Sequence, residues 1–135
     1  MAKGEVYHHS QFPFHDGQIG DKFFVLLNDP QNDEPYIVVR TTSNLRNRHY
    51  QTGCNSNFGD FFVPSGTEKL FPKDTVVQLV ETYEFSTAEF LNGCLNDKII
   101  SNIGSLSSIT LAQLINCVRK LKNDISEHHF KMITR

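Results

Sequence analysis

Apolar residues follow a strand-like pattern in the first two thirds of the chain and a helical pattern in the last third. Five short apolar segments alternate with turns rich in Gly, Pro, Asn and Asp, and each predicts a β-strand. These segments are 5–11, 22–28, 36–42, 59–63 and 75–85. The segment from Lys22 to Asn28 is almost continuously apolar, which is typical of a strand covered on both faces. The pattern predicts an α+β protein with a strongly bent antiparallel sheet or small barrel.

Two helices are expected after the last of these strands. Ser86 is a good N-cap, and Glu89 completes a capping box for a short helix that ends near Gly93. A long C-terminal helix begins near Ser107 or Ser108, and apolar residues recur along it at helical spacing up to Ile125. Its apolar stripe is expected to pack on the sheet or, as the second choice, to form a dimer contact. Residues 126–135 are expected to be an exposed tail.

Length and composition fit one globular domain over residues 1–135. The chain is 39% hydrophobic and 21% charged, and is long enough to bury a core without disulfides or metals. Its formal net charge is −2, so RNA binding would depend on a local basic patch. The three cysteines are widely spaced and odd in number, so we expect them to be reduced and structural.

No membrane segment or signal peptide is expected. The longest apolar run, Phe23 to Leu27, is far shorter than the roughly 20 residues of a membrane-spanning helix. The N-terminus reaches polar residues before the apolar centre of a signal peptide could develop. The sequence therefore predicts a cytoplasmic protein.

Short motifs along the chain resemble, in order, those of the MazF/PemK toxin family. Lys3-Gly4-Glu5-Val6-Tyr7 is similar to the family's opening strand, and Ile103-Gly104-Ser105-Leu106-Ser107 to the start of its terminal helix. The intervening matches are 12–17, 22–29, 37–43 and 74–79, so the resemblance covers about residues 3–125. It implies an SH3-like curled barrel, a homodimer and a cofactor-free, metal-independent endoribonuclease neutralised by an antitoxin. The chain departs from the family at Lys22-Phe23, where Arg-Pro is usual.

Metal-independent RNA cleavage needs a proton acceptor for the 2′-hydroxyl, a cation for the phosphate and an acid for the leaving oxygen. Lys22 is the candidate cation, although an ammonium binds phosphate as a point charge. Thr41 stands at the family's threonine position and could contact the phosphate or orient Lys22. Alternatively, it could simply be a residue that suits a β-strand. Thr42 takes its place if the strand register is shifted by one. His15 is the candidate acid or base, although a lone loop histidine is commonly only solvated.

A local basic segment is the candidate for RNA binding. Arg40, Arg46, Arg48 and His49 occur with no acidic residue between them. Such a segment could follow the backbone of single-stranded RNA, or it could be an ordinary solvated loop. His8 and His9 project to opposite faces of one strand, and His128-His129 falls in the expected tail, so no metal site is predicted.

Three functions remain open from the sequence. The first is a toxin-like endoribonuclease acting on single-stranded RNA. The second is a catalytically degenerate module that only binds RNA or a partner protein, which the Lys22 substitution favours. The third is a structural interaction protein whose dimer surface is its purpose.

Overall fold

The computed structural model describes residues 1–135 as an α+β fold with one open, seven-stranded antiparallel sheet and three helices. The strands are β1 Glu5–Pro13, β2 Ile19–Leu26, β3 Tyr36–Thr42, β4 Gly53–Asn55, β5 Asp60–Val63, β6 Thr75–Phe85 and β7 Ile100–Ser105. The helices are α1 Thr87–Leu95, α2 Ser108–Lys120 and α3 Glu127–Thr134. The strand order is β4-β5-β6-β3-β2-β1-β7. The α+β class and the antiparallel sheet predicted from the sequence are confirmed, and β4 and β7 are the two free edges.

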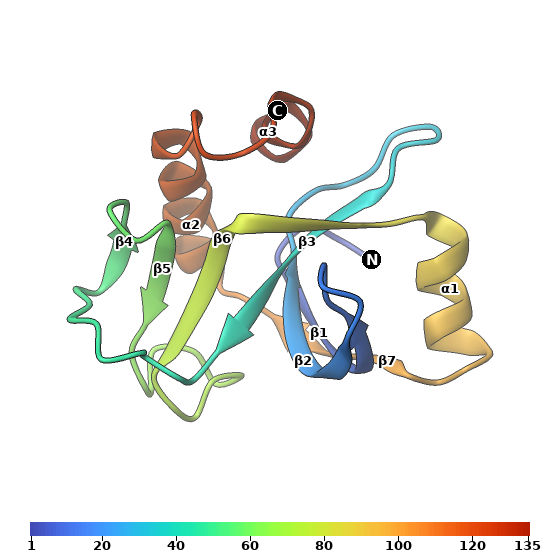
Figure 1. Ribbon diagram of the computed structural model, residues 1–135, viewed down its shortest axis with the longest axis horizontal. Helices are drawn as coiled ribbons and strands as arrows, with labels where there is room; N and C mark the ends of the chain where they lie inside the picture. The colour runs from blue at the N-terminus through green and yellow to red at the C-terminus, as the bar shows by residue number, and fades with distance from the viewer.

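Two hydrophobic cores form on opposite faces of this sheet. Alternating residues of β2 divide between them: Val25 belongs to the core covered by α2 and α3, and Phe24 to the core covered by α1. Figure 1 shows α2 and α3 side by side at the upper left and top of the molecule and α1 at its right-hand end, with strands of the sheet between them. The chain is covered on both faces from Phe24 to Leu27, as the apolar run predicts, whereas Phe23 is 42% exposed.

The helical region differs from the prediction at its C-terminal end. Ser86 and Glu89 form the expected capping box of α1. The predicted continuous helix up to Ile125 is wrong, because α2 ends at Lys120 and a turn follows. The polar sequence of this turn, Lys122-Asn123-Asp124, favours a break in the helix.

Residues 126–135 are not a tail. Ser126 caps α3, and Met132 and Ile133 on this helix are 3% and 0% exposed in the core beneath it. The Lys3 ammonium donates to the Ile133 carbonyl at 2.5 Å, which fastens the helix to the start of the chain. The last ten residues therefore complete the core.

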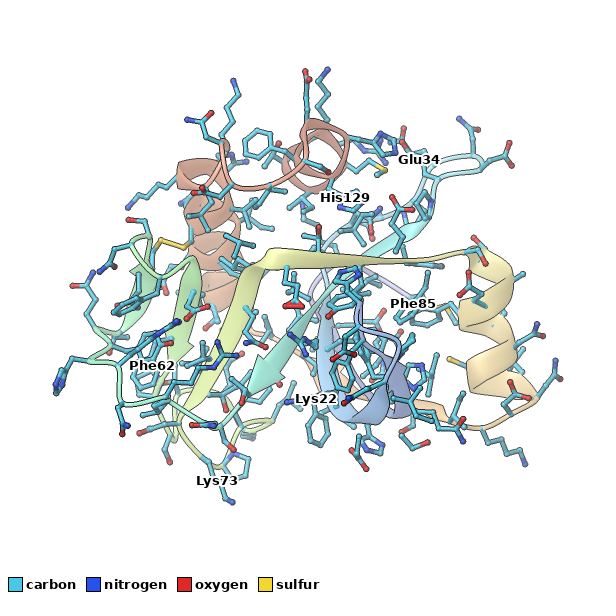
Figure 2. All side chains as sticks on the ribbon, viewed as in Figure 1. Lys22, Glu34, Phe62, Lys73, Phe85 and His129 are labelled. Carbon is cyan, nitrogen blue, oxygen red and sulfur yellow. A yellow bond between two sulfur atoms is a disulfide. The ribbon has the colours of Figure 1, made fainter.

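A disulfide between Cys54 and Cys117 corrects the expectation of three reduced cysteines. It joins β4 to α2, with 5.3 Å between the two Cα atoms, and appears as a yellow bond in Figure 2. Cys94 is the one free cysteine. The disulfide attaches β4, which lies between β3 and β5 in the sequence, to α2.

No helix in the structure combines the length and the apolar character that crossing a membrane requires.

Candidate functional site

A hollow of about 400 Å³ lies where β2 and β3 meet the loop before β6. Its lining residues are Asp21, Lys22, Phe23, Thr41, Thr42, Ser43, Leu70, Phe71, Pro72, Lys73 and Thr75. Figure 2 shows Lys22 and Lys73 on the same, lower side of the molecule in that view. The hollow therefore gathers two lysines and several hydroxyl groups, which are groups that bind phosphate.

Lys22 is a half-buried cation without a counter-ion. No carboxylate lies within 4 Å of its ammonium, and the neighbouring Asp21 is paired with His8 at 2.5 Å instead. Burial lowers the pKa of Lys22, and the positive charges of Arg40 and Arg46 lower it further. The charges of Arg40 and Arg46 thus act on Lys22 and add to the positive potential around it, which favours the binding of an anion.

Thr41 lines the hollow but is largely buried. It is 5% exposed, and its hydroxyl donates to the Phe23 carbonyl at 3.4 Å. The β2–β3 register pairs Phe24 with Arg40; continuing it sets Lys22 opposite Thr42 and therefore on the same face. Thr42 is half-buried and also lines the hollow. The same alternation directs Thr41 to the opposite face of β3, so the register sets Thr42, the second choice from the sequence, beside Lys22.

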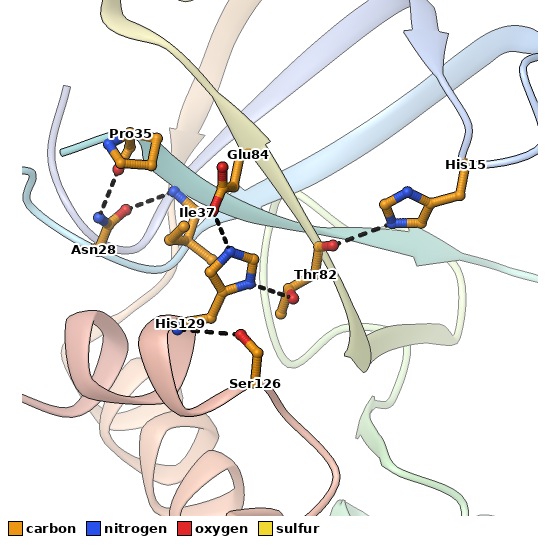
Figure 3. A network of polar contacts seen from close by, with 8 residues as sticks. All are labelled: His15, Asn28, Pro35, Ile37, Thr82, Glu84, Ser126 and His129. Carbon is orange, nitrogen blue, oxygen red and sulfur yellow. Dashed lines mark hydrogen bonds and ion pairs between the residues drawn. The ribbon is translucent and has the colours of Figure 1, made fainter.

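His15, in the loop between β1 and β2, lies outside this hollow and packs against β6. Its ring is stacked on Tyr83 with 3.9 Å between centroids, and its Nε2 lies 3.2 Å from the Thr82 carbonyl oxygen. Figure 3 shows Thr82 between two histidines, its carbonyl oxygen facing His15 and its hydroxyl facing His129. The His15 contact leaves the ring exposed to solvent.

Arg40 belongs to the same cluster as His15. Its guanidinium lies over the rings of Phe14 and Tyr83 and contacts both carboxylate oxygens of Glu81, at 2.8 and 2.9 Å. Tyr83 donates to Glu81 at 2.7 Å; burial, and then this carboxylate, raise the pKa of Tyr83 to about 12. Sequence reasoning missed Glu81 and Tyr83. Their two-residue spacing on β6 was the available signal, because it places both side chains on one face.

Arg48 makes contacts within the protein and is not free at the surface. It is paired with Asp60 at 3.2 Å and lies over the Phe58 ring, and Tyr50 donates to the same carboxylate at 2.6 Å. Arg46 and His49 remain exposed beside a shallow hollow formed by residues 44–49. Of the basic segment predicted to bind RNA, Arg46 and His49 are therefore the members free to contact a ligand.

His129, expected in an exposed tail, is instead a half-buried contact between α3 and β6. Its Nδ1 lies 2.7 Å from the Thr82 hydroxyl and its Nε2 lies 2.5 Å from Glu84, as Figure 3 shows. No group of three or more His, Cys, Asp or Glu side chains in the structure is arranged to hold a metal ion.

Comparison with known proteins adds one distant similarity. No family model matches the chain. A dual serine/threonine and tyrosine protein kinase of Gallus gallus is 21% identical over 115 residues, which is 84% of this chain. The chain spans only 12% of the length of that kinase. This identity over so small a part of the larger protein does not show a family for the chain.

Proposed function

We propose that this protein is a metal-independent endoribonuclease that cleaves single-stranded RNA. The observation that carries the proposal is the half-buried, unpaired ammonium of Lys22 in a hollow that also holds the two threonines. An RNA phosphate would supply the counter-ion that the Lys22 ammonium lacks. Arg46, whose charge already acts on Lys22, is placed to hold the adjoining stretch of RNA backbone.

In this mechanism the 2′-hydroxyl loses its proton and its oxygen attacks the neighbouring phosphorus. The bond from phosphorus to the 5′-oxygen breaks, and that oxygen receives a proton. Lys22 stabilises the negative charge that develops on the phosphate, and Thr41 or Thr42 donates a hydrogen bond to it. His15 is the proposed proton carrier, because its imidazole is exposed and is stacked on Tyr83, which donates to Glu81 and lies beneath the Arg40 guanidinium.

The proposal includes a relationship to the MazF/PemK family. The open sheet would be a version of that family's SH3-like curled barrel, and the protein would be a cytoplasmic homodimer neutralised by an antitoxin. Light scattering of the purified protein measures its mass and so tests the homodimer. A mass of one chain would contradict the homodimer. A small protein encoded beside this one, tested for co-purification, is the candidate antitoxin.

The decisive experiment incubates the purified protein with a long single-stranded RNA in excess chelator and maps new 5′ ends. We expect cleavage that is lost in Lys22→Ala. Lys122→Ala is the matched control, because Lys122 is exposed in the turn after α2 and lines none of the hollows described here. Cleavage that survives in Lys22→Ala would contradict the proposed role of this ammonium.

Two observations favour a second function, a module that binds RNA without cleaving it. His15 does not line the hollow that contains Lys22, and an ammonium lacks the fixed fork of a guanidinium. Tight, salt-sensitive RNA binding without new 5′ ends would support this second function.

A further inference from the structure

A second hollow, of about 320 Å³, lies between β1, α1 and the turn that leads into β7. Phe85 forms part of its apolar wall, and its polar lining comes from His9, Gln11, Glu89, Asn92 and Asp97. No lysine or arginine lines it. Its electrostatic character is therefore the opposite of the hollow around Lys22.

His9 presents an unused hydrogen-bond donor in this hollow. Its side chain belongs to a residue that is 5% exposed, and its Nδ1 accepts the backbone N–H of Gln11 at 3.1 Å. Burial, and then the charge of His8, lower the pKa of His9, which favours the neutral ring. Because Nδ1 accepts a hydrogen bond, the proton of that neutral ring is on Nε2. Nε2 has no protein partner, yet it is not among the polar atoms sealed inside the fold. This donor is therefore open to an acceptor from outside the chain, either water or a ligand.

The two carboxylates of the hollow supply acceptors without cations. Asp97 makes no side-chain hydrogen bond or ion pair within the chain. The Glu89 carboxylate accepts only the backbone N–H of Ser86, at 3.3 Å, and leaves its second oxygen free. A ligand that fits must therefore accept a hydrogen bond from His9 and donate hydrogen bonds to a carboxylate.

We propose that this hollow binds a nucleobase carrying an exocyclic amino group, with guanine the best match. Guanine offers O6 and N7 as acceptors for the His9 Nε2–H, and its N1–H and amino group as donors for a carboxylate. Uracil has a single donor between two carbonyl oxygens, which a carboxylate repels. A purely cationic ligand would satisfy Asp97 and Glu89 but leave the His9 donor without a partner.

This base site deepens the proposed function and rests on it for its substrate. His9 on β1 and Lys22 on β2 are direct partners in the strand register, and their Cα atoms in such a pair are about 5 Å apart. One RNA strand could therefore place a phosphate on Lys22 and a base beside His9. The site would then select which base stands next to the cleaved bond.

The test titrates isotopically labelled protein with guanosine, cytidine, adenosine and uridine and follows the His9 imidazole and Asp97 amide signals by NMR. We expect guanosine to shift both signals most and uridine least. Asp97→Asn should weaken guanosine binding about tenfold, because a hydrogen bond to a charged acceptor is replaced by a neutral one. Asp33→Asn, the same substitution at an exposed turn position outside the hollow, should leave the binding unchanged.

Equal shifts from all four nucleosides, or shifts from an alkylammonium ion but from no nucleoside, would overturn the inference. Nucleosides carry no phosphate, so this outcome is independent of Lys22. Selective guanosine binding by a protein that cleaves no RNA would leave the base site in place and contradict the proposed endoribonuclease. RNA cleavage by a protein that binds no nucleoside would support the endoribonuclease and contradict the base site.

Discussion

Arg40 on β3 and Glu81 on β6 form a cross-strand ion pair in which Nη2 lies 2.8 Å from Oε1. The pair neutralises a guanidinium whose side chain is only 15% exposed and whose Nε is buried without a partner. It also explains why Arg40 cannot serve as a freely available phosphate contact, although its charge still acts on Lys22. The carboxylate thus controls how much positive charge this end of the sheet presents.

Replacing this carboxylate should cost stability and change the titration of its neighbour. Glu81→Gln leaves the Arg40 charge without a counter-ion, and we expect the free energy of unfolding in urea to fall by about 1–3 kcal/mol. The pKa of Tyr83 should fall from about 12, because Glu81 contributes to raising it after burial does. Ultraviolet titration of the tyrosines measures this change. Glu127→Gln, at an exposed position on α3, is the control, and an unchanged Tyr83 titration would contradict the contact.

Introducing a guanidinium at position 22 should strengthen phosphate binding. In Lys22→Arg a planar fork can make two charge-assisted hydrogen bonds where the ammonium acts as a point charge. We expect the affinity for a short single-stranded RNA to rise about fivefold, as one additional hydrogen bond would give. Fluorescence anisotropy at two salt concentrations measures it, with Lys122→Arg as the control. Weaker binding by Lys22→Arg would show that no phosphate occupies the hollow.

The C-terminal residue makes stability depend on pH in the acidic range. Arg135 lowers the pKa of Glu34 to about 2, first by a hydrogen bond, so the folded state binds this proton less readily than the unfolded chain. Stability from this pair is complete above the ordinary Glu pKa near 4.5 and is lost as the pH falls from there toward 2. In Glu34→Gln, urea unfolding between pH 5 and pH 2 should show a shallower loss. Asp33→Asn should retain the original slope.

The Cys54–Cys117 disulfide should contribute strongly to stability. It closes a sequence separation of 63 residues, for which the chain-entropy model gives about 4 kcal/mol. We expect Cys54→Ser, or reduction of the wild-type protein, to lower the free energy of unfolding by up to that amount. Thiol titration of the denatured, unreduced protein should find one free thiol per chain, that of Cys94. Three free thiols would contradict the pairing.

Elements with a strong local signal could be predicted from the sequence. The apolar run of β2 and the Ser86–Glu89 capping box are local patterns, and both were correct. Strand β7 was missed because its sequence, ISNIGS, contains two apolar residues and pairs only through distant β1. Helix α3 was missed because eight residues are too few to reveal a helical period. The disulfide depends on tertiary proximity, which spacing alone does not provide.

The candidate site could also be predicted only where it depends on elements that are close in the sequence. Lys22 and Thr41 lie in neighbouring strands whose order follows the chain, so their presence at one hollow could be anticipated, whereas the face on which each side chain lies depends on the register. The ion pairs of Arg40 and Arg48 join residues 41 and 12 positions apart, and they change two expected RNA contacts into structural ones. His9 was considered only as a metal ligand, because the hollow around it forms when α1 folds back beside β1.

Helix α3 has a consequence for how the protein is made. Synthesis runs from the N-terminus, so Met132 and Ile133 emerge after the sheet and α2, with which they share a core. Until α3 has been translated and has left the exit tunnel, the apolar surface beneath it has no cover. In that interval the nascent sheet and α2 are a substrate for chaperones.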